Sequence, residues 1–411
     1  MSDPQRPHGE ARTAWPDART VWLDARGLQH GFKEHIGRGI GAYVASLAVA
    51  LDAEAAEGRL RLLVERGADL IAGVPASRLL EVPVPLHGSS RLATQLRQHL
   101  ILAAWITVRS PAAVHFPAQT DAPVFVGTRA VVTVHDVFLH RRDLATATGG
   151  MAATRLRVAR ALERLAVRRA ARLIAPSRVT AQDLTRTLGV SPSRIAVIPE
   201  AARPGFSAIA GPDDVAVRAR LRLPERYLLH SGRADPRKRL PELIAVFDAI
   251  ARGDRDLHLV LVGPVTSGEA APDVLRAIRV AAAADRIRLL GVVDEAAMPP
   301  VYRGALAVVL ATQHEGFGLP VVEAFASGVP VVATAAPAIL EVAGDAARLV
   351  PVDQLDALPD ALREVIGNRA LADDLRARGL ARAAQFRWSR IAAETLQVYE
   401  EVTGETGLAR G

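Results

Sequence analysis

The chain alternates between short apolar runs and longer amphipathic segments over nearly its whole length. In the first half, the apolar runs that we interpret as strands lie at residues 21–26, 59–65, 112–118, 130–136, 172–177 and 195–199. In the second half, they lie at residues 227–233, 257–263, 287–293, 306–312, 329–334 and 347–351. The runs are apolar throughout rather than alternating, as expected for parallel strands that are covered on both faces.

Segments with helical periodicity separate most of these strands. They lie at residues 42–56, 91–105, 155–170, 178–189, 241–251, 271–284, 296–305 and 319–328. After the last strand only helices follow, at residues 358–367, 369–386 and 388–404. The pattern predicts an α/β protein of two doubly wound, Rossmann-like domains that face each other across a cleft. We expect the final helix, about 388–404, to cross back onto the N-terminal domain.

Residues 199–214 are rich in Pro, Gly and Ala, which is typical of a domain boundary. We therefore place an N-terminal domain at residues 1–205 and a C-terminal domain at residues 206–387. Open parallel sheets bind ligands beyond the carboxyl ends of their strands, so the cleft between the domains is the expected site.

Charge and composition restrict the class of ligand. The 411 residues carry a net charge of +7, which favours anionic partners such as nucleotides or phospholipid surfaces. Aromatic residues make up only 4% of the chain, too few for a base-stacking surface, so we expect no nucleic-acid partner. The absence of cysteine excludes disulfides and thiol chemistry. Only two of the basic residues are lysines, Lys33 and Lys238.

The N-terminus is polar and carries acids, unlike a signal peptide, and no apolar run approaches the roughly 18 residues of a membrane span. We expect a soluble, cytoplasmic protein. The basic amphipathic segment from Arg155 to Arg172 predicts peripheral contact with an anionic membrane at its inner face. A solvated helix face is the alternative interpretation of this segment.

The stretch "HEGFGLPVVEAFASGVPVV" from His314 places two acids around a glycine turn. Gly316 and Gly318 let a ligand approach the backbone, and Pro320 suits the first turn of a helix. Glu315 precedes the turn and Glu323 lies one turn into the helix. Because a carboxylate accepts two hydrogen bonds at once, the two acids suit a ligand with two sets of hydroxyls, a sugar and a ribose.

Two further motifs favour phosphate binding. Arg233 and Lys238 follow the first strand of the second half, where an ammonium and a guanidinium together would neutralise a diphosphate. Gly37, Gly39 and Gly41 precede a helix, and glycine-rich loops there cradle phosphates. Gly37 to Ala42 also satisfies the dinucleotide fingerprint, but about a dozen residues separate it from the preceding strand, which disfavours a dinucleotide-binding oxidoreductase.

His135 and Asp136 end a predicted strand and would point into the cleft, where a histidine can donate to or accept from a substrate hydroxyl. No matching set of metal ligands accompanies them. The sequence "DRD" at Asp254 formally matches an Asp-x-Asp metal motif, but it lies on the loop before a strand. We expect no metal and no cofactor.

The stretch "EGFGLPVVEAFASGVPVV" resembles the two-glutamate signature of retaining glycosyltransferases of family 4, which have the GT-B fold. Other blocks resemble that family in the family's order: "RGIGAY", "TVHD", "LIAPSRVTAQDL", "VIPEAARPGF", "GRADPRKRL" and "AILEVAGDAARLV". The resemblance extends from about Val21 to Tyr399. The sequence departs from the family at "LATQHEGF", which lacks the usual Pro-Ser, and at "VFLH", where a proline is usual.

The resemblance implies that the N-terminal domain, residues 1–205, binds the acceptor and that the C-terminal domain, residues 206–387, binds the nucleotide-sugar donor. It also implies a role for each matching residue. Glu323 would bind the ribose of the donor and Glu315 the transferred hexose, with His135 beside the reacting sugar. The diphosphate would be held by Arg233 and Lys238 and by the loop of Gly39 and Gly41. The backbone around Glu315 would complete the donor site at Gly316, Phe317, Gly318 and Leu319.

The implied activity is a retaining, metal-independent transfer of a hexose to a hydroxyl of a glycan or lipid-linked saccharide in cell-surface polysaccharide synthesis. The "TVHD" and "PRK" blocks are most similar to mannosyltransferase-like members, so GDP-mannose is the expected donor, with a UDP- or ADP-sugar as alternative. A hydrolase or phosphorylase of activated sugars would share the fold. An oxidoreductase is the alternative from another class.

Overall fold

The structure is a computed structural model that describes residues 19–29, 39–66, 78–82, 94, 96–124, 126, 129–140 and 150–409. Seven parallel strands form the N-terminal sheet in the order β3-β2-β1-β4-β5-β6-β7. They are β1 (Val21–Asp24), β2 (Leu60–Glu65), β3 (Leu79–Val82), β4 (Ala113–Phe116), β5 (Ala130–Thr133), β6 (Arg172–Ala175) and β7 (Ile195–Val197). The longer helices of this domain are α1 (Gly39–Glu54), α3 (Ala103–Arg109), α4 (Gly150–Arg169) and α5 (Arg178–Leu188).

Six parallel strands form the C-terminal sheet in the order β10-β9-β8-β11-β12-β13. They are β8 (Tyr227–Ser231), β9 (His258–Val262), β10 (Ile287–Gly291), β11 (Ala307–Leu310), β12 (Val331–Thr334) and β13 (Arg348–Val350). The helices are α6 (Asp214–Arg220), α7 (Leu240–Ala251), α8 (Ala271–Val280), α9 (Met298–Arg303), α10 (Leu319–Ala326), α11 (Pro337–Ala343), α12 (Leu358–Gly367), α13 (Arg369–Ala383) and α14 (Trp388–Thr403).

Short helical turns lie at several strand ends. They are η1 (Arg26–Leu28), η4 (Gln119–Asp121), η5 (Phe138–His140), η6 (Pro192–Arg194), η7 (Pro236–Lys238), η8 (Ala284–Arg286), η9 (Glu295–Ala297) and η10 (Leu355–Ala357). A π-helical segment, η3 (Arg97–Leu102), runs directly into α3. The order of the parallel strands in each sheet, which reverses direction at β1 and at β8, is the doubly wound organisation that the strand and helix pattern predicts.

Both faces of each sheet are covered, which explains why the strands are apolar throughout. On β1, Trp22 packs into one core of the N-terminal domain and its neighbour Leu23 packs into the other. On β11, Val308 and Val309 divide in the same way between the two cores of the C-terminal domain. Successive side chains of a strand point to opposite faces, so a strand with two buried faces has no polar positions to alternate with.

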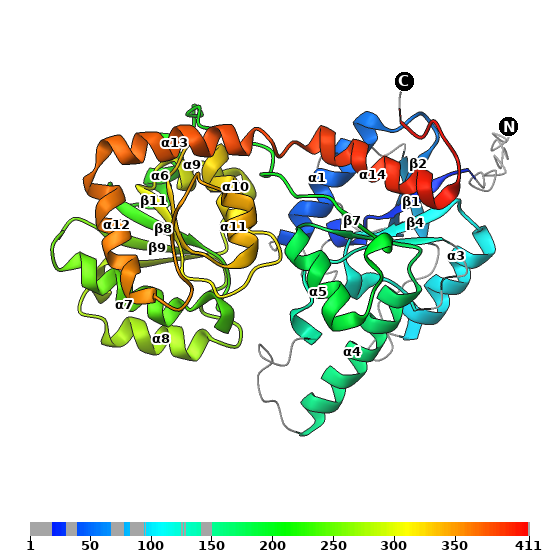
Figure 1. The fold of residues 1–411 in the computed structure, drawn as a ribbon, viewed down its shortest axis with the longest axis horizontal. Coiled ribbons are helices and arrows are strands. Elements are labelled where there is room, and N and C mark those ends of the chain that lie inside the picture. Colours follow the sequence, from blue (N-terminus) through cyan, green and yellow to red (C-terminus); the bar gives the residue numbers. More distant parts are fainter. Residues whose placement is uncertain are drawn as a thin grey trace, which may run out of the picture.

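Helix α14 returns to the N-terminal domain, as the sequence pattern predicts. Figure 1 shows α13 along one edge of the C-terminal lobe and α14 beside α1 on the other lobe. Ile391, Leu396 and Tyr399 of α14 lie in the same core cluster as Leu23 of β1. The helix ends at Gly404, whose φ of 72° is the left-handed conformation common after a helix.

Four details differ from the sequence prediction. Strand β3 and helix α6 were not predicted; both are short, and β3 lies at the edge of its sheet. The basic segment from Arg155 to Arg172, which was predicted to contact a membrane, is helical only to Arg169, and its last residue, Arg172, belongs to β6. Gly39 and Gly41 form the first turn of α1 rather than a loop. Lys33 and Gly37 lie outside the described residues.

A buried hydrogen bond attaches α14 to the N-terminal sheet. The hydroxyl of Tyr399 lies 2.7 Å from Nδ1 of His115 on β4, and Nε2 of His115 lies 2.8 Å from the hydroxyl of Thr133. Burial lowers the pKa of His115 to about 3, so the ring is neutral and has one donor and one acceptor nitrogen. Both nitrogens are satisfied only while Tyr399 is in place.

We expect Tyr399→Phe to lower the free energy of unfolding by about 1–2 kcal/mol, because one nitrogen of His115 would be buried without a partner. Urea denaturation measures this loss. Tyr43→Phe is the matched control, because its hydroxyl lies 3.4 Å from Thr133, a longer and weaker contact, and should cost less. An equal loss in both variants would contradict the role of the Tyr399–His115 bond.

Candidate active site in the interdomain cleft

Two loops of the C-terminal sheet meet because their strands are neighbours. Strands β8 and β11 lie side by side where the strand order reverses, and such a switch point is the usual ligand site of a doubly wound sheet. The chain leaves β8 toward Lys238 and leaves β11 toward Glu315. The Nζ atom of Lys238 lies 2.9 Å from Oε1 of Glu315. The sheet order thus brings together two residues that the sequence singled out separately.

Glu315 is held as a carboxylate. Burial alone would raise the pKa of Glu315, but the positive charges of Lys238 and Arg237 outweigh it and lower the pKa below its ordinary value. The acid therefore accepts hydrogen bonds at neutral pH and does not donate them.

The glycine turn after Glu315 lies against the N-terminal domain. A Cβ atom at Gly316 would lie 1.9 Å from the carbonyl oxygen of His135, so only glycine fits there. The carbonyl of Gly316 accepts hydrogen bonds from the hydroxyls of Ser177, at 2.6 Å, and Thr180, at 3.0 Å. Gly318 has a φ of 112°, which an L side chain rarely adopts. Both glycines are therefore required by the local backbone.

Helix α10 begins directly after this turn. Phe317 is buried and its ring meets that of Phe386 at 5.8 Å, which fixes the turn to the last helices. Leu319 is the first residue of α10, and a Cβ atom at Gly39 would lie 4.0 Å from its Cδ2 atom. Gly41 follows in the same first turn of α1 and is buried. The starts of α1 and α10 therefore face each other across the cleft.

Glu323 is paired with an arginine that the sequence pattern did not predict. Its carboxylate is buried, and Oε1 lies 2.5 Å from Nε of Arg203, in the segment between the two sheets. Burial raises the pKa of Glu323, and the charge of Arg203 offsets part of that rise. The sequence holds only an indirect signal for this pair. A buried acid is usually paired with a cation, and Arg203 is the cation of the block "VIPEAARPGF".

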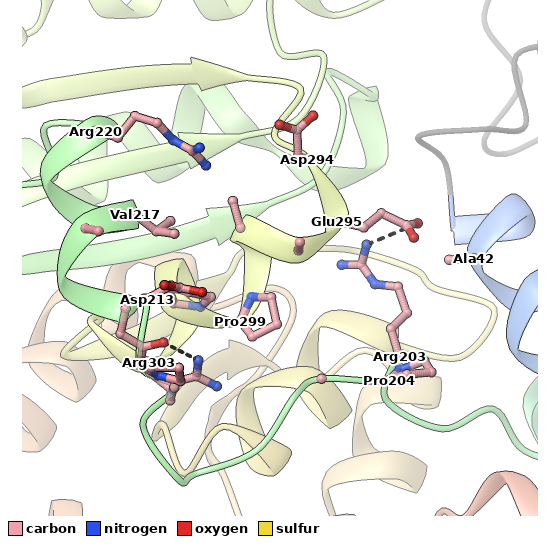
Figure 2. A pocket seen from close by; sticks show the side chains of 18 of the residues that line it. Ala42, Arg203, Pro204, Asp213, Val217, Arg220, Asp294, Glu295, Pro299 and Arg303 are labelled. Atoms are coloured by element: carbon pink, nitrogen blue, oxygen red, sulfur yellow. Dashed lines mark hydrogen bonds and ion pairs between the residues drawn. The ribbon is translucent and has the colours of Figure 1, made fainter. Parts of the chain in front are cut away.

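A hollow of about 980 Å³ lies beside this pair. It is lined by α1, by the segment around Arg203 and by α6, η9 and α9, and Figure 2 shows Arg203 directed toward Glu295. The guanidinium of Arg203 lies 3.9 Å from the carboxylate of Glu295, so a single side chain connects Glu323 with the rim of the hollow. Asp294 also lines it. The size is that of a cavity for a nucleotide-sized ligand.

His135 lies near the turn, but its ring is already bound to protein. Nδ1 lies 2.9 Å from a carboxylate oxygen of Glu200, and Nε2 lies 2.8 Å from the carbonyl oxygen of Pro117. Burial would lower the pKa of His135, but the hydrogen bond and charge of Glu200 raise it above its ordinary value. Because both partners are acceptors, both nitrogens donate and the ring is a cation. A direct bond from His135 to a sugar would require one of these bonds to break.

The basic residues of the loop after β8 differ in their partners. Arg237, which was not singled out from the sequence, pairs with Asp235 at 2.7 Å and stacks 3.4 Å from the ring centre of Phe138. The side chain of Arg233 is exposed and forms no hydrogen bond or ion pair with any residue that the structure describes, whereas its backbone carbonyl accepts from the N–H of Asp235. The side chain is therefore available to an anion.

Other contacts between the two domains surround the site. Nε2 of His314 lies 3.1 Å from a carboxylate oxygen of Asp183, on α5. The carboxylate of Glu341, on α11, accepts hydrogen bonds from the backbone N–H groups of Arg178, at 2.9 Å, and Val179, at 3.3 Å. An acid at a helix N-terminus is stabilised there, so Glu341 fastens α11 to the start of α5.

Asp254 of the "DRD" sequence forms an ion pair with Arg226 at 2.8 Å. Within the described ranges, three or more side chains of metal-ligating type do not come together anywhere.

Comparisons with known proteins agree with this architecture. The profile of "Glycosyltransferase Family 4" matches residues 37–203, and that of "Glycosyl transferases group 1" matches residues 216–382. The sucrose-phosphate synthase of Thermosynechococcus elongatus superimposes with a TM-score of 0.74 at 22% identity, over 94% of this chain and 99% of that chain. At that identity the likeness shows the fold, two Rossmann-like domains in the GT-B arrangement.

Two curated relatives are mannosyltransferases. The O-antigen chain mannosyltransferase B of Escherichia coli is 30% identical over 175 residues, which are 42% of this chain and 45% of that protein. The phosphatidyl-myo-inositol mannosyltransferase of Mycolicibacterium smegmatis is 35% identical over 185 residues, 44% of this chain and 46% of that protein. The chain spans about half the length of these relatives. From the two matching profiles, the relatives and the GT-B fold, we conclude that the chain belongs to glycosyltransferase family 4.

Proposed function

We propose that this protein transfers a hexose from a nucleoside diphosphate sugar to a hydroxyl acceptor, with GDP-mannose as donor and with retention of the anomeric configuration. The Lys238–Glu315 ion pair carries the proposal, because it places a sugar-binding carboxylate and a phosphate-binding ammonium 2.9 Å apart at the switch point of the C-terminal sheet. An oxidoreductase would have no use for that combination.

The departing nucleoside diphosphate is stabilised by fixed positive charge. The ammonium of Lys238 has three donors, of which one serves Glu315, so the others can meet phosphate oxygens. Arg233 adds a guanidinium that forms a fork with two such oxygens. We propose that these two cations perform the role that a divalent metal performs in other transferases, and that the reaction is independent of metal.

The two acids divide the donor between them. Glu315, ionised by its two cationic neighbours, accepts hydrogen bonds from hydroxyls of the hexose. Glu323 accepts from the ribose, and Arg203 fixes its orientation by holding Oε1.

The hollow beside Arg203 favours guanine. Asp294 and Glu295 line it, and a carboxylate can accept hydrogen bonds from N1–H and N2–H of guanine together. Uracil offers a single N–H between two carbonyls and pairs less well with a carboxylate. This supports GDP-mannose over a UDP-sugar as donor.

The acceptor belongs on the N-terminal side of the cleft. We propose a hydroxyl of a glycan or of a lipid-linked saccharide, and peripheral contact with the membrane surface that holds such a lipid. His135 contributes a fixed positive charge near the turn, oriented by Glu200.

The function is tested by incubating the protein with GDP-mannose, UDP-glucose or ADP-glucose and a lipid-linked saccharide, with and without EDTA. We expect transfer from GDP-mannose that survives EDTA, with an α product by NMR. Glu315→Gln should lower kcat about 30-fold, for a lost charge-assisted bond of about 2 kcal/mol, and change GDP affinity little. Hydrolysis without transfer, or binding of NAD alone, would overturn the proposal.

Replacing Lys238 should weaken diphosphate binding. We expect Lys238→Ala to reduce GDP affinity on the order of tenfold or more, because an ammonium–phosphate contact is lost. Lys238→Arg should reduce GDP affinity less than Lys238→Ala does, because the positive charge is kept. It should still reduce the affinity, because the planar guanidinium fits a compact site poorly.

Calorimetry with GDP and with guanosine separates the contribution of the phosphates, because guanosine affinity should stay unchanged in both Lys238 variants. Arg226→Ala is the control, since Arg226 precedes the amino end of β8, whereas Lys238 follows its carboxyl end. Wild-type GDP affinity in Lys238→Ala would remove Lys238 from the site.

Removing Arg203 should make stability strongly dependent on pH. In Arg203→Met, the pKa of buried Glu323 should rise further above its unfolded value. An acid whose folded pKa is raised binds more protons when folded, so stability falls as pH rises through that range. The loss should reach about 3–5 kcal/mol at neutral pH and be small below about pH 4.

Urea denaturation of Arg203→Met at both pH values measures this dependence. The same substitution in a Glu323→Gln background is the control, since the amide carries no charge to leave unpaired. A loss that does not change with pH would show that Arg203 acts on something other than Glu323.

A further inference from the structure

A row of apolar side chains lies uncovered along η3 and α3. We call it the apolar stripe, and it consists of Leu96, Leu100, Ile101, Ala104 and Val108. Val108 is 76% exposed, Leu100 55%, Leu96 51% and Ile101 38%. The opposite side of the same segment is also apolar, with Leu102 and Ile106 fully buried in the core. A surface helix usually has a polar outer face, so a helix that is apolar on both sides indicates a partner.

The sequence segment that contains the apolar stripe carries arginines but no acids. No Asp or Glu occurs from Val82 to Thr120, a stretch that contains three arginines. Two of them border the stripe: Arg97 follows Leu96, and Arg109 follows Val108. The guanidinium of Arg109 lies 5.1 Å from the ring centre of Trp105, which holds it at the end of the stripe.

Helix α4 adds positive charge next to the stripe. The backbone of Val124 joins the two helices, because its N–H donates to Nδ1 of His99, at 3.2 Å, and its carbonyl accepts from Arg169, at 3.5 Å. The only acid of α4, Glu163, is buried against His140. Arg164 and Arg168 donate to the backbone carbonyls of Thr187 and Leu188 at the end of α5. The positive charge of α4 that is connected with η3 is therefore that of Arg169.

We propose that the apolar stripe is the surface by which this protein lies on an anionic membrane. The side chains of Leu96, Leu100, Ile101 and Val108 enter the boundary between headgroups and acyl chains, and the bordering arginines meet lipid phosphates. The inference rests on the proposed membrane-held acceptor. The sequence pattern predicts membrane contact at the Arg155–Arg172 segment, whereas this proposal places the apolar part of that contact at η3 and α3.

The charge pattern favours a lipid surface over a second copy of the chain. A bilayer rich in anionic lipid presents uniform negative charge, which complements a segment that carries arginines and no acids. Two copies that paired through the stripe would bring their arginines together, and like charges at an interface repel. In the part of the chain that the structure describes, no helix combines the length and apolar character needed to cross a bilayer, so the proposed contact is made by a helix lying along the surface.

Co-sedimentation with vesicles tests the proposal and needs neither donor nor acceptor, so its result is independent of the transfer reaction. The vesicles contain equal parts of phosphatidylglycerol and phosphatidylcholine, or phosphatidylcholine alone. The test variant is Leu100→Gln with Val108→Gln. The control is Leu340→Gln with Val280→Gln, whose side chains are 49% and 79% exposed on the C-terminal domain. Thermal unfolding confirms that both variants are folded.

We expect wild type and control to bind the anionic vesicles and to bind phosphatidylcholine weakly. The stripe variant should bind the anionic vesicles on the order of tenfold less, because two apolar side chains no longer enter the bilayer. High salt should weaken wild-type binding. Equal binding of the stripe variant and wild type, or no wild-type binding at low salt, would overturn the proposal. A wild-type dimer that becomes a monomer in the stripe variant would assign the stripe to self-association instead.

Discussion

The site depends on one constraint: a carboxylate stays ionised in a protein interior only when a cation lies beside it. Glu323 is buried and Glu315 is largely buried, and each has a cation from a different segment. Lys238 reaches Glu315 because β8 and β11 are neighbours in the sheet. Arg203 reaches Glu323 from the connection between the domains. The order of the strands thus brings a cation to Glu315, and the position of the interdomain segment brings one to Glu323.

The fold follows closely from the sequence because parallel strands buried on both faces leave a simple signal. Trp22 and Leu23 are adjacent and both apolar because each packs into a different core. The signal fails where burial is incomplete. Strand β3 has a single fully buried residue, Val82, and contains Glu81, so its pattern resembles a loop. Helix α6 is short and mostly exposed, with an outer surface that gives no apolar periodicity. The domain limits at residues 205 and 206 stay predictions.

The site was predictable in its residue types and less so in its contacts. The glycine turn, the two acids and the lysine were recognisable because each stands at a strand end next to a helix start. Which cation pairs with which acid depends on strand order and on the interdomain segment, and neither is encoded locally. His135 illustrates the same limit. Its ring is held by Glu200 and by the carbonyl of Pro117, both of which reach it through the tertiary fold.

The return of α14 to the first domain has a consequence for the order of events during synthesis. Chains emerge from the ribosome from the N-terminus, and domains usually fold as units in that order. Here the core around Leu23 is completed by Ile391, Leu396 and Tyr399, which are made only after the whole C-terminal sheet. Until they arrive, one face of the first domain remains apolar and open to solvent. The N-terminal domain thus cannot complete its core until the C-terminal domain has been synthesised.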